Sequence, residues 1–257
     1  MDIDIKILIA THKPCWFPTD RIYLPIQVGS SGKESILPGI QRDDEGVNIS
    51  EKNNLYCELT AQYWGWKNLI CDYIGLVQYR RFFKGKKSIN HERKILGEAE
   101  LLALLAKEEI VLPQKRHYFI ETLEQHFDNY DFSEPDDLLL LRDVINDISP
   151  DYLASFDNIF RLRAGHMFNM FIMNKKLFDK FCEWEFLILE EIERRIEIVR
   201  SRLIGYFAEH MLDIWIDKNK LSYVEHPIYL LDKKNDLGRK IDFLLRKTPI
   251  KYRFIKL

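Results

Sequence analysis

Short apolar runs that alternate with helical patterns constrain the fold of this chain most strongly. The first run, Ile5–Ala10, has the length of a buried strand and ends in a Thr-His-Lys-Pro loop. An aromatic stripe at helical spacing then predicts a helix over residues 50–68, with Ser50 as its N-cap. A second apolar run, Asp72–Phe83, becomes cationic at its end. This alternation favours an α/β fold with a mixed, mostly parallel sheet flanked by helices.

The rest of the chain continues the pattern. A helix over residues 99–107 and a strand over 109–112, stopped by Pro113, give another strand–helix–strand unit. Helix starts at Ser133 and Ser149, each followed closely by proline, predict a helical insertion over residues 118–163 that covers the sheet as a lid or acceptor subsite. The last predicted elements are a strand over 166–174, helices over 175–200 and 203–218, and a strand-like segment over 222–231.

Length and composition indicate one large domain. The chain has 257 residues, of which 46% are apolar and 30% charged, enough for a sizeable core and unlike a disordered chain. Its net charge of −2 conceals a basic segment over residues 237–257, with seven Lys or Arg and one Asp. We therefore expect a domain over residues 1–236 and a basic tail over 237–257. The acidic remainder excludes a generally basic nucleic-acid-binding protein.

The basic tail has two interpretations. Its aromatic and leucine residues are interleaved with cations, a composition suited to the surface of an anionic membrane. The alternative is a solvated terminal helix or strand that packs on the domain. Because the sequence has no apolar run long enough to cross a bilayer and no signal peptide, we expect a cytoplasmic protein, peripheral at the inner face of the cell membrane if the tail binds lipid.

Several familiar site motifs are missing from the sequence. It contains no GxGxxG, no GxxxxGK[ST], no GxSxG and no HExxH, so dinucleotide, P-loop, hydrolase and metalloprotease templates lack support. Its four cysteines form no CxxC pair, and we interpret them as reduced, mostly buried thiols.

Cationic residues follow several of the predicted strands. Ligands of open α/β sheets bind outside the carboxyl ends of the strands, and arginine matches phosphate oxygens in paired hydrogen bonds. We therefore expect a diphosphate there, although a surface salt-bridge cluster explains an arginine pair equally well. In a regular strand Arg80 and Arg81 would point to opposite faces, and one of them would reach the ligand. The strand-end residues are Thr11, His12, Lys13, Tyr79, Arg80, Arg81, Lys115, Arg116 and Asn174.

Two carboxylates lie one turn apart on the predicted helix over residues 203–218. Glu209 stands in an apolar stretch, and Asp213 shares its face, so either could serve as a general base in a cleft. The alternative is a surface charge paired with Lys or Arg. The pair Asp43 and Asp44 in the loop over 29–54 is either a ligand or a turn former. His166, His210 and His226 are widely separated, which favours structural roles.

Several segments together resemble one known family, the domain of unknown function numbered 4422 of bacterial capsule and exopolysaccharide loci, which is grouped with glycosyltransferases. The resemblance runs in order along nearly the whole chain. The matching segments are Asn48–Asn53, Tyr56–Thr60, Tyr63–Asn68, Tyr73–Leu76, Tyr79–Arg81, Leu112–Pro113, Gly165–Met173, Gly205–Tyr206 and Ala208–Glu209.

The resemblance implies a GT-A-like transferase that moves galactofuranose or galactose from a UDP-sugar to a saccharide or lipid-linked saccharide acceptor, in capsule, exopolysaccharide or O-antigen synthesis. One departure concerns the metal. The wider GT-A pattern places Asp-x-Asp at the end of the strand that here ends in Tyr-Arg-Arg, and Gln78 stands where the family usually has His. Arginine could neutralise the leaving diphosphate directly, so a need for Mn²⁺ or Mg²⁺ is left open.

The combined hypothesis is an inverting transfer in which Glu209 or Asp213 deprotonates the acceptor. The acceptor-binding residues are expected to be His166 and Asn169. Competing functions are a non-catalytic nucleotide-sugar or carbohydrate-binding module and, less favoured, nucleic-acid binding through the tail. The expected donor-binding residues are Thr11, His12, Lys13, Asp44, Asn48, Ser50, Lys52, Asn53, Tyr79, Arg80 and Arg81.

Overall fold

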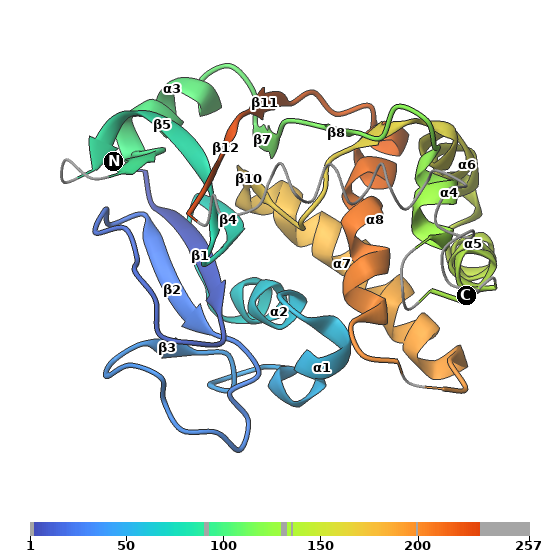
Figure 1. Cartoon of the computed structure of the whole chain (residues 1–257), viewed down its shortest axis with the longest axis horizontal. Helices are drawn as coiled ribbons and strands as arrows, with labels where there is room; N and C mark the ends of the chain where they lie inside the picture. The colour runs from blue at the N-terminus through green and yellow to red at the C-terminus, as the bar shows by residue number, and fades with distance from the viewer. Residues whose placement is uncertain (1–2, 90–92, 130–132, 135, 199, 232–257) are drawn as a thin grey trace, which may run out of the picture.

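A ten-stranded mixed sheet forms the centre of the molecule (Figure 1). The computed structural model describes residues 3–89, 93–129, 133–134, 136–198 and 200–231. The main path of the sheet runs in the order β11-β7-β10-β4-β1-β2-β3, and β5, β6 and β12 continue from β4. The strands are β1 (Ile5–Thr11), β2 (Tyr23–Gln27), β3 (Gln41–Arg42), β4 (Tyr73–Gln78), β5 (Arg81–Ile89), β6 (Arg93–Ile95), β7 (Ile110–Pro113), β10 (Phe171–Asn174), β11 (Val224–His226) and β12 (Ile228–Leu230).

The pairing is parallel on one side of β4 and changes direction on the other. Strands β4, β1, β2 and β3 are parallel neighbours, and β7 is parallel to β11. Strand β10 is antiparallel to both β4 and β7, and β5 turns back antiparallel to β4. A separate two-stranded ribbon joins β8 (Arg116–His117) to β9 (Ala164–Gly165). The expected mixed, mostly parallel sheet is confirmed.

Two apolar layers cover the two faces of the sheet. Side chains alternate along β1, so Leu8 faces the larger cluster and Ile7 and Ile9 face the smaller one. Because both faces of β1 are buried, nearly all of its residues are apolar, and its sequence is an almost continuous apolar run. The helical elements are η1 (Ser50–Lys52), α1 (Asn53–Tyr56), α2 (Leu59–Asn68), α3 (Glu98–Leu105), α4 (Leu123–Asp128), α5 (Asp137–Ile148), η2 (Pro150–Tyr152), α6 (Leu153–Arg161), α7 (Lys175–Arg195) and α8 (Leu203–Asn219).

The expected helical insertion is present as α4, α5 and α6. These helices gather on one side of the molecule, next to α7 and α8 (Figure 1). Helix α5 packs against α7, and α6 packs against α8, so the insertion extends the larger apolar layer. Helix α5 begins at Asp137, after an N-cap at Asp136, and not at Ser133 as expected.

Two of the predicted elements are broken. The helix expected over residues 50–68 is interrupted at Cys57, whose φ of 53° and ψ of −130° are not helical. Ser50 does not cap it, because its hydroxyl bonds Asp43 instead. The strand expected over residues 72–83 is a β4–β5 hairpin with Tyr79 and Arg80 at its turn, so Arg80 and Arg81 do not alternate along one regular strand.

Other predicted boundaries shift as well. Residues 166–170 form a loop, and only Phe171–Asn174 is strand. Because β10 runs antiparallel to β4, Asn174 lies at the opposite edge of the sheet from the carboxyl end of β4, where it caps α7. Helix α7 ends at Arg195, five residues before the predicted end. No helix among the described residues has the length and apolar character of a membrane span.

Candidate active site

A cleft of about 590 Å³ opens at the carboxyl ends of β1 and β4. The β4–β5 turn lines it with Gln78, Tyr79, Arg80 and Arg81. The segment around the α1–α2 break and the first two turns of α8 close it from other sides. These contribute Asn53, Asn54, Cys57, Glu58, Arg202, Tyr206 and Glu209.

Arginines dominate the charge of the cleft. Its lining includes Arg80, Arg81, Arg116 and Arg202, against the carboxylates Glu58 and Glu209. The Arg81 guanidinium lies 4.3 Å from the centre of the Phe168 ring and donates to the Gln78 side-chain oxygen. Such a concentration of guanidinium groups suits an anion with several oxygens, such as a diphosphate.

Glu209 is the carboxylate with the most perturbed surroundings in the cleft. Burial, and then the negative charge of Glu58, raise its pKa to about 8, although Arg81, Arg116 and Arg202 oppose the shift. Its side chain is partly exposed to the cleft. A carboxylate with such a pKa is ionised, and can accept a proton from a bound hydroxyl, at mildly alkaline pH.

Glu58 is instead held by neighbouring amides. Gln78 Nε2 donates to Glu58 Oε1 at 2.7 Å, and Asn169 Nδ2 donates to the same oxygen at 3.2 Å. Gln78 Nε2 also donates to the Phe168 carbonyl at 3.0 Å, and Asn169 Nδ2 to the Gly205 carbonyl at 3.2 Å. Gln78 and Asn169 therefore tie together β4, the loop before β10, α2 and α8 at the floor of the cleft.

The backbone is strained where these loops meet. Among the described residues, six non-glycine residues have positive φ, and three of them, Cys57, Phe168 and Arg202, line the cleft. A fourth, Asn169, bonds Glu58. Conformations of this kind cost on the order of 1–3 kcal/mol each and concentrate at functional sites.

The loop after β1 borders the cleft through His12. Its ring makes an edge contact with Tyr79 at 5.3 Å, and Lys13 Nζ lies 5.1 Å from the centre of the same Tyr79 ring. Burial, with help from the charges of Lys13 and Arg80, lowers the pKa of His12. Thr11 is fully buried and donates its hydroxyl to the Lys13 carbonyl at 2.8 Å, so it shapes the loop.

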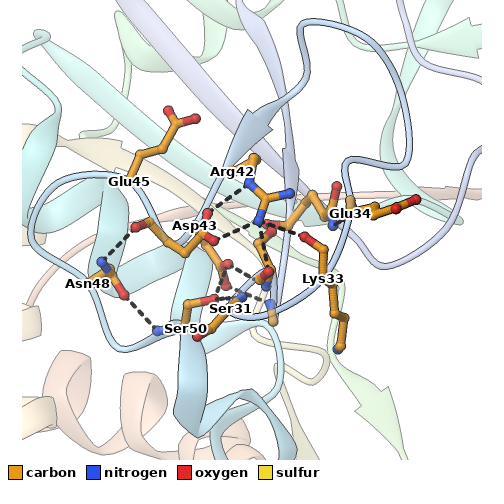
Figure 2. A network of polar contacts seen from close by, with 12 residues as sticks. Ser31, Lys33, Glu34, Arg42, Asp43, Glu45, Asn48 and Ser50 are labelled. Atoms are coloured by element: carbon orange, nitrogen blue, oxygen red, sulfur yellow. Dashed lines mark hydrogen bonds and ion pairs between the residues drawn. The ribbon is translucent and has the colours of Figure 1, made fainter.

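The polar loop before η1 is organised around a buried carboxylate (Figure 2). Asp43 accepts hydrogen bonds from the backbone of Gly29 at 2.8 Å and Ser30 at 3.0 Å, and from the Ser50 hydroxyl. Asp44 pairs with Arg42, and Asn48 Nδ2 donates to the Asp44 carbonyl at 3.0 Å. The structure thus places Asp44, Asn48 and Ser50 in the frame of the loop and outside the cleft lining.

Lys52 and Asn53, which were both expected to bind the donor, differ in their position relative to the cleft. Asn53 lines the cleft and donates to the Cys57 carbonyl and the Thr60 hydroxyl, which holds the α1–α2 break. Lys52 pairs with Glu193 at 2.8 Å and does not line the cleft.

Asp213 faces away from the cleft despite its spacing from Glu209. Its carboxylate accepts from the His166 backbone at 2.9 Å and from the His166 ring. The other ring nitrogen of His166 lies 3.3 Å from Glu225. His166 and Asp213 are both buried and form a structural pair, whereas Asn169 reaches the cleft floor.

The described residues of the cleft do not fit a divalent metal site. Among them no group of three His, Cys, Asp or Glu side chains converges. Gln78, Tyr79 and Arg80 occupy the end of β4, where the GT-A pattern has its acidic motif, and Glu58 already accepts two amide hydrogen bonds. The charge of the lining matches an anion more closely than a cation.

Fold and cleft together define an α/β protein of GT-A-like architecture with an arginine-lined cleft at the carboxyl ends of β1 and β4. The chain belongs to the family described as Domain of unknown function (DUF4422), whose model matches residues 6–220. The expected family and fold class are therefore confirmed.

The chain is also similar to solved structures. It matches the apo structure of the bifunctional glycosyltransferase WbbM with a TM-score of 0.81 and 27% identity, over 90% of this chain and 46% of that chain. It thus spans about half the length of that chain. A glucosyl-3-phosphoglycerate synthase from Mycobacterium tuberculosis, in complex with Mg²⁺ and UDP, matches at a TM-score of 0.31 and 8% identity over 86% of this chain and 80% of that chain, too low to carry an argument. No curated protein sequence matches.

Part of the cleft lining is absent from the site residues that the sequence predicts. Glu58 and Gln78 fall within or beside segments that carry the family resemblance, so that resemblance was a usable signal for them. Arg116 was among the strand-end cations but was not among the expected donor-binding residues. Arg202 and Tyr206 come to the cleft only through the packing of α8, and no local pattern distinguishes Arg202.

Proposed function

We propose that this protein is a glycosyltransferase that uses a nucleoside-diphosphate sugar as donor. The observation that carries the proposal is the cleft at the carboxyl ends of β1 and β4, which is lined by four arginines and by Glu209, a carboxylate whose pKa is raised to about 8. Arginines can stabilise the charge that develops on a leaving nucleoside diphosphate, and the carboxylate can accept the proton of an acceptor hydroxyl.

Arg80, Arg81 and Arg202 hold the diphosphate in this proposal, and His12 and Tyr79 border the nucleoside. During transfer the anomeric carbon loses its bond to the diphosphate oxygen and gains one to the acceptor oxygen. The acceptor proton goes to Glu209, and the nucleoside diphosphate leaves with its charge neutralised by arginine. An attack from the Glu209 side, opposite the leaving group, inverts the anomeric carbon. Asp213 positions His166 and takes no proton.

The finer assignments are also proposals. The similarity to the bifunctional glycosyltransferase WbbM and membership of the DUF4422 family support a glycosyl transfer, and the family resemblance favours UDP-galactofuranose or UDP-galactose as donor. The acceptor is a saccharide, free or lipid-linked, in capsule, exopolysaccharide or O-antigen synthesis at the cytoplasmic face of the membrane. Residues 237–257, the basic tail for which the sequence leaves membrane binding and packing on the domain open, lie outside the described residues.

Thermal shift with a panel of nucleotides and nucleotide sugars tests the donor site. Each ligand is measured with Mn²⁺ and with a chelator, because a ligand that binds only the folded state raises its apparent stability. We expect a selective rise with UDP and its galactose forms that persists with the chelator. No rise with any nucleotide sugar would contradict the proposal, and a rise that depends on Mn²⁺ would contradict neutralisation by arginine alone.

A non-catalytic nucleotide-sugar-binding module is the second candidate. The raised pKa of Glu209 favours this module, because a carboxyl with a pKa of about 8 is mostly protonated at neutral pH and cannot act as a base there. Donor binding without release of UDP, in the presence of acceptor saccharides and across neutral to alkaline pH, would support the module. Release of UDP that depends on Glu209 would support the transferase.

A further inference from the structure

Exposed apolar side chains lie on two adjacent segments, one that follows β8 and one that follows α6. Of the nine large apolar side chains that are exposed among the described residues, three lie here: Phe119 is 79% exposed, Ile120 is 60% and Leu162 is 45%. Two backbone contacts bring their segments together, from Tyr118 N to the Arg163 carbonyl at 2.9 Å and from Leu123 N to the Leu162 carbonyl at 2.7 Å. Residues 116–120 and 161–163 are called the basic apolar tip below.

The conformation of Phe119 holds its ring outward at a cost. Its φ of 57° is unfavourable for a bulky residue, yet most of the ring is exposed and contributes little to the core. Arg163 Nη1 donates to the Phe119 carbonyl at 3.1 Å, and the neighbouring Tyr118 is buried, so the turn is anchored on both sides. A strained turn that presents an aromatic ring to solvent indicates a surface built for contact.

Three arginines belong to the same two segments as these apolar side chains. Arg116, Arg161 and Arg163 are all exposed. Asp157, the acid one turn before Arg161, is already paired with Arg142 at 2.9 Å, and the exposed acid closest in sequence is Glu124 on α4. The tip therefore combines protruding apolar groups with a net positive charge.

We propose that the basic apolar tip inserts into the surface of an anionic lipid membrane. A stable protein partner needs on the order of 800 Å² of complementary surface on each side, more than three side chains provide. A membrane interface needs only a few inserted apolar groups and neighbouring cations, which is what the tip offers. Arg116 belongs both to the tip and to the cleft lining, so docking would place the cleft mouth at the lipid surface. The inference stands on the tip alone and does not require the proposed function.

Co-sedimentation of the full chain with vesicles tests the proposal. The vesicles contain phosphatidylcholine alone or phosphatidylcholine with phosphatidylglycerol. The test variant is Phe119→Ser with Ile120→Ser, and the matched control is Ile70→Ser, because Ile70 is 96% exposed but precedes β4 at the opposite end from the cleft. We expect wild type and the control to bind vesicles with phosphatidylglycerol, and the tip variant to lose about tenfold or more in partitioning.

Charge substitutions separate the electrostatic attraction to anionic lipid from the insertion of apolar side chains into the membrane. Arg161→Glu should weaken binding to vesicles with phosphatidylglycerol, whereas Lys107→Glu, an exposed lysine elsewhere, should not. No binding by either protein would overturn the proposal. Equal binding by wild type and the tip variant would also overturn it, and would assign the binding to another segment, such as residues 232–257. Melting temperatures of the tip variants equal to that of wild type would show that they fold, and this control holds whether or not the protein binds UDP.

Discussion

At the residue scale, two glutamates share a raised pKa but differ in location. Glu209 lines the cleft, whereas Glu185 on α7 is fully enclosed and accepts a hydrogen bond from Gln62. Burial is the main cause in both, and each pKa rises to about 8. Replacing each of them by glutamine therefore gives a test variant, Glu209→Gln, and a matched control, Glu185→Gln.

Glu209→Gln should lower kcat about 100- to 10,000-fold, because it removes the proposed base while it keeps the shape of the side chain. Donor binding, measured by thermal shift, should persist, since the amide is neutral and adds no negative charge to the proposed donor site. Glu185→Gln should leave kcat near that of wild type. Near-normal turnover in Glu209→Gln would remove Glu209 from the mechanism.

The pH dependence of kcat/KM offers an independent check on Glu209. Its ionised form is the active base, so kcat/KM should rise with pH and level off above about 8. In Glu209→Gln the residual rate should lose that rise. A wild-type profile that stays flat across this range would contradict the assignment.

Arg80 is an exposed contributor to the proposed diphosphate site. Arg80→Ala should weaken UDP binding about 10- to 100-fold, because a hydrogen bond to a charged group contributes about 1.5–3 kcal/mol. Isothermal titration with UDP measures the effect. Arg21→Ala, which removes an exposed arginine paired with Glu98, is the control and should bind UDP as wild type does.

At the element scale, the loop before η1 depends on one carboxylate of an adjacent pair (Figure 2). Asp43 is fully buried and satisfies two backbone amides and a hydroxyl, whereas Asp44 pairs with Arg42 nearer the surface. Asp43→Ala should lower the free energy of unfolding by about 3 kcal/mol or more, because buried donors lose their partner. Asp44→Ala should cost about 1 kcal/mol or less. Chemical denaturation of both variants measures the difference, and equal losses would contradict the role of Asp43.

Strand direction is also decided at this scale. The β4–β5 turn places Arg80 and Arg81 at the cleft together, an outcome that a regular strand would not allow. Because β10 runs antiparallel to β4, Asn174 lies beside the start of β4, at the end of the sheet away from the cleft. Asn169, five residues earlier, lies at the cleft floor.

At the scale of the whole molecule, the buried glutamates make stability depend on pH. The folded-state pKa of Glu185 and Glu209 is raised from 4.5 to about 8, so the folded chain binds more protons than the unfolded chain between these values. Their contribution to stability is present below pH 4.5 and is lost as pH rises through 8. Wild type should therefore lose stability over this window, and Glu185→Gln should lose less. Denaturation curves at several pH values check this, and parallel curves for the two proteins would contradict it.

The sequence alone determined the parts of the protein that local patterns report. Apolar runs and helical spacing were enough for the α/β class, the order of most elements and the helical insertion, because side-chain periodicity reflects which faces are buried. The same local signals single out Arg80, Arg81 and Glu209 as candidates, because each is a charged residue within or directly after an apolar run, and the structure places all three in the cleft lining.

Only the tertiary structure decided which of the expected residues meet. Asp213 lies one helical turn from Glu209 but accepts hydrogen bonds from His166 and does not reach the cleft. Asp44 and Ser50 bond Arg42 and Asp43 and so hold the loop before η1. Glu58 and Arg202 reach the cleft because α2, α8 and the strand ends converge there. The physical reason is that strand direction, helix breaks and hydrogen bonds across the chain depend on contacts between distant residues, which no local periodicity records.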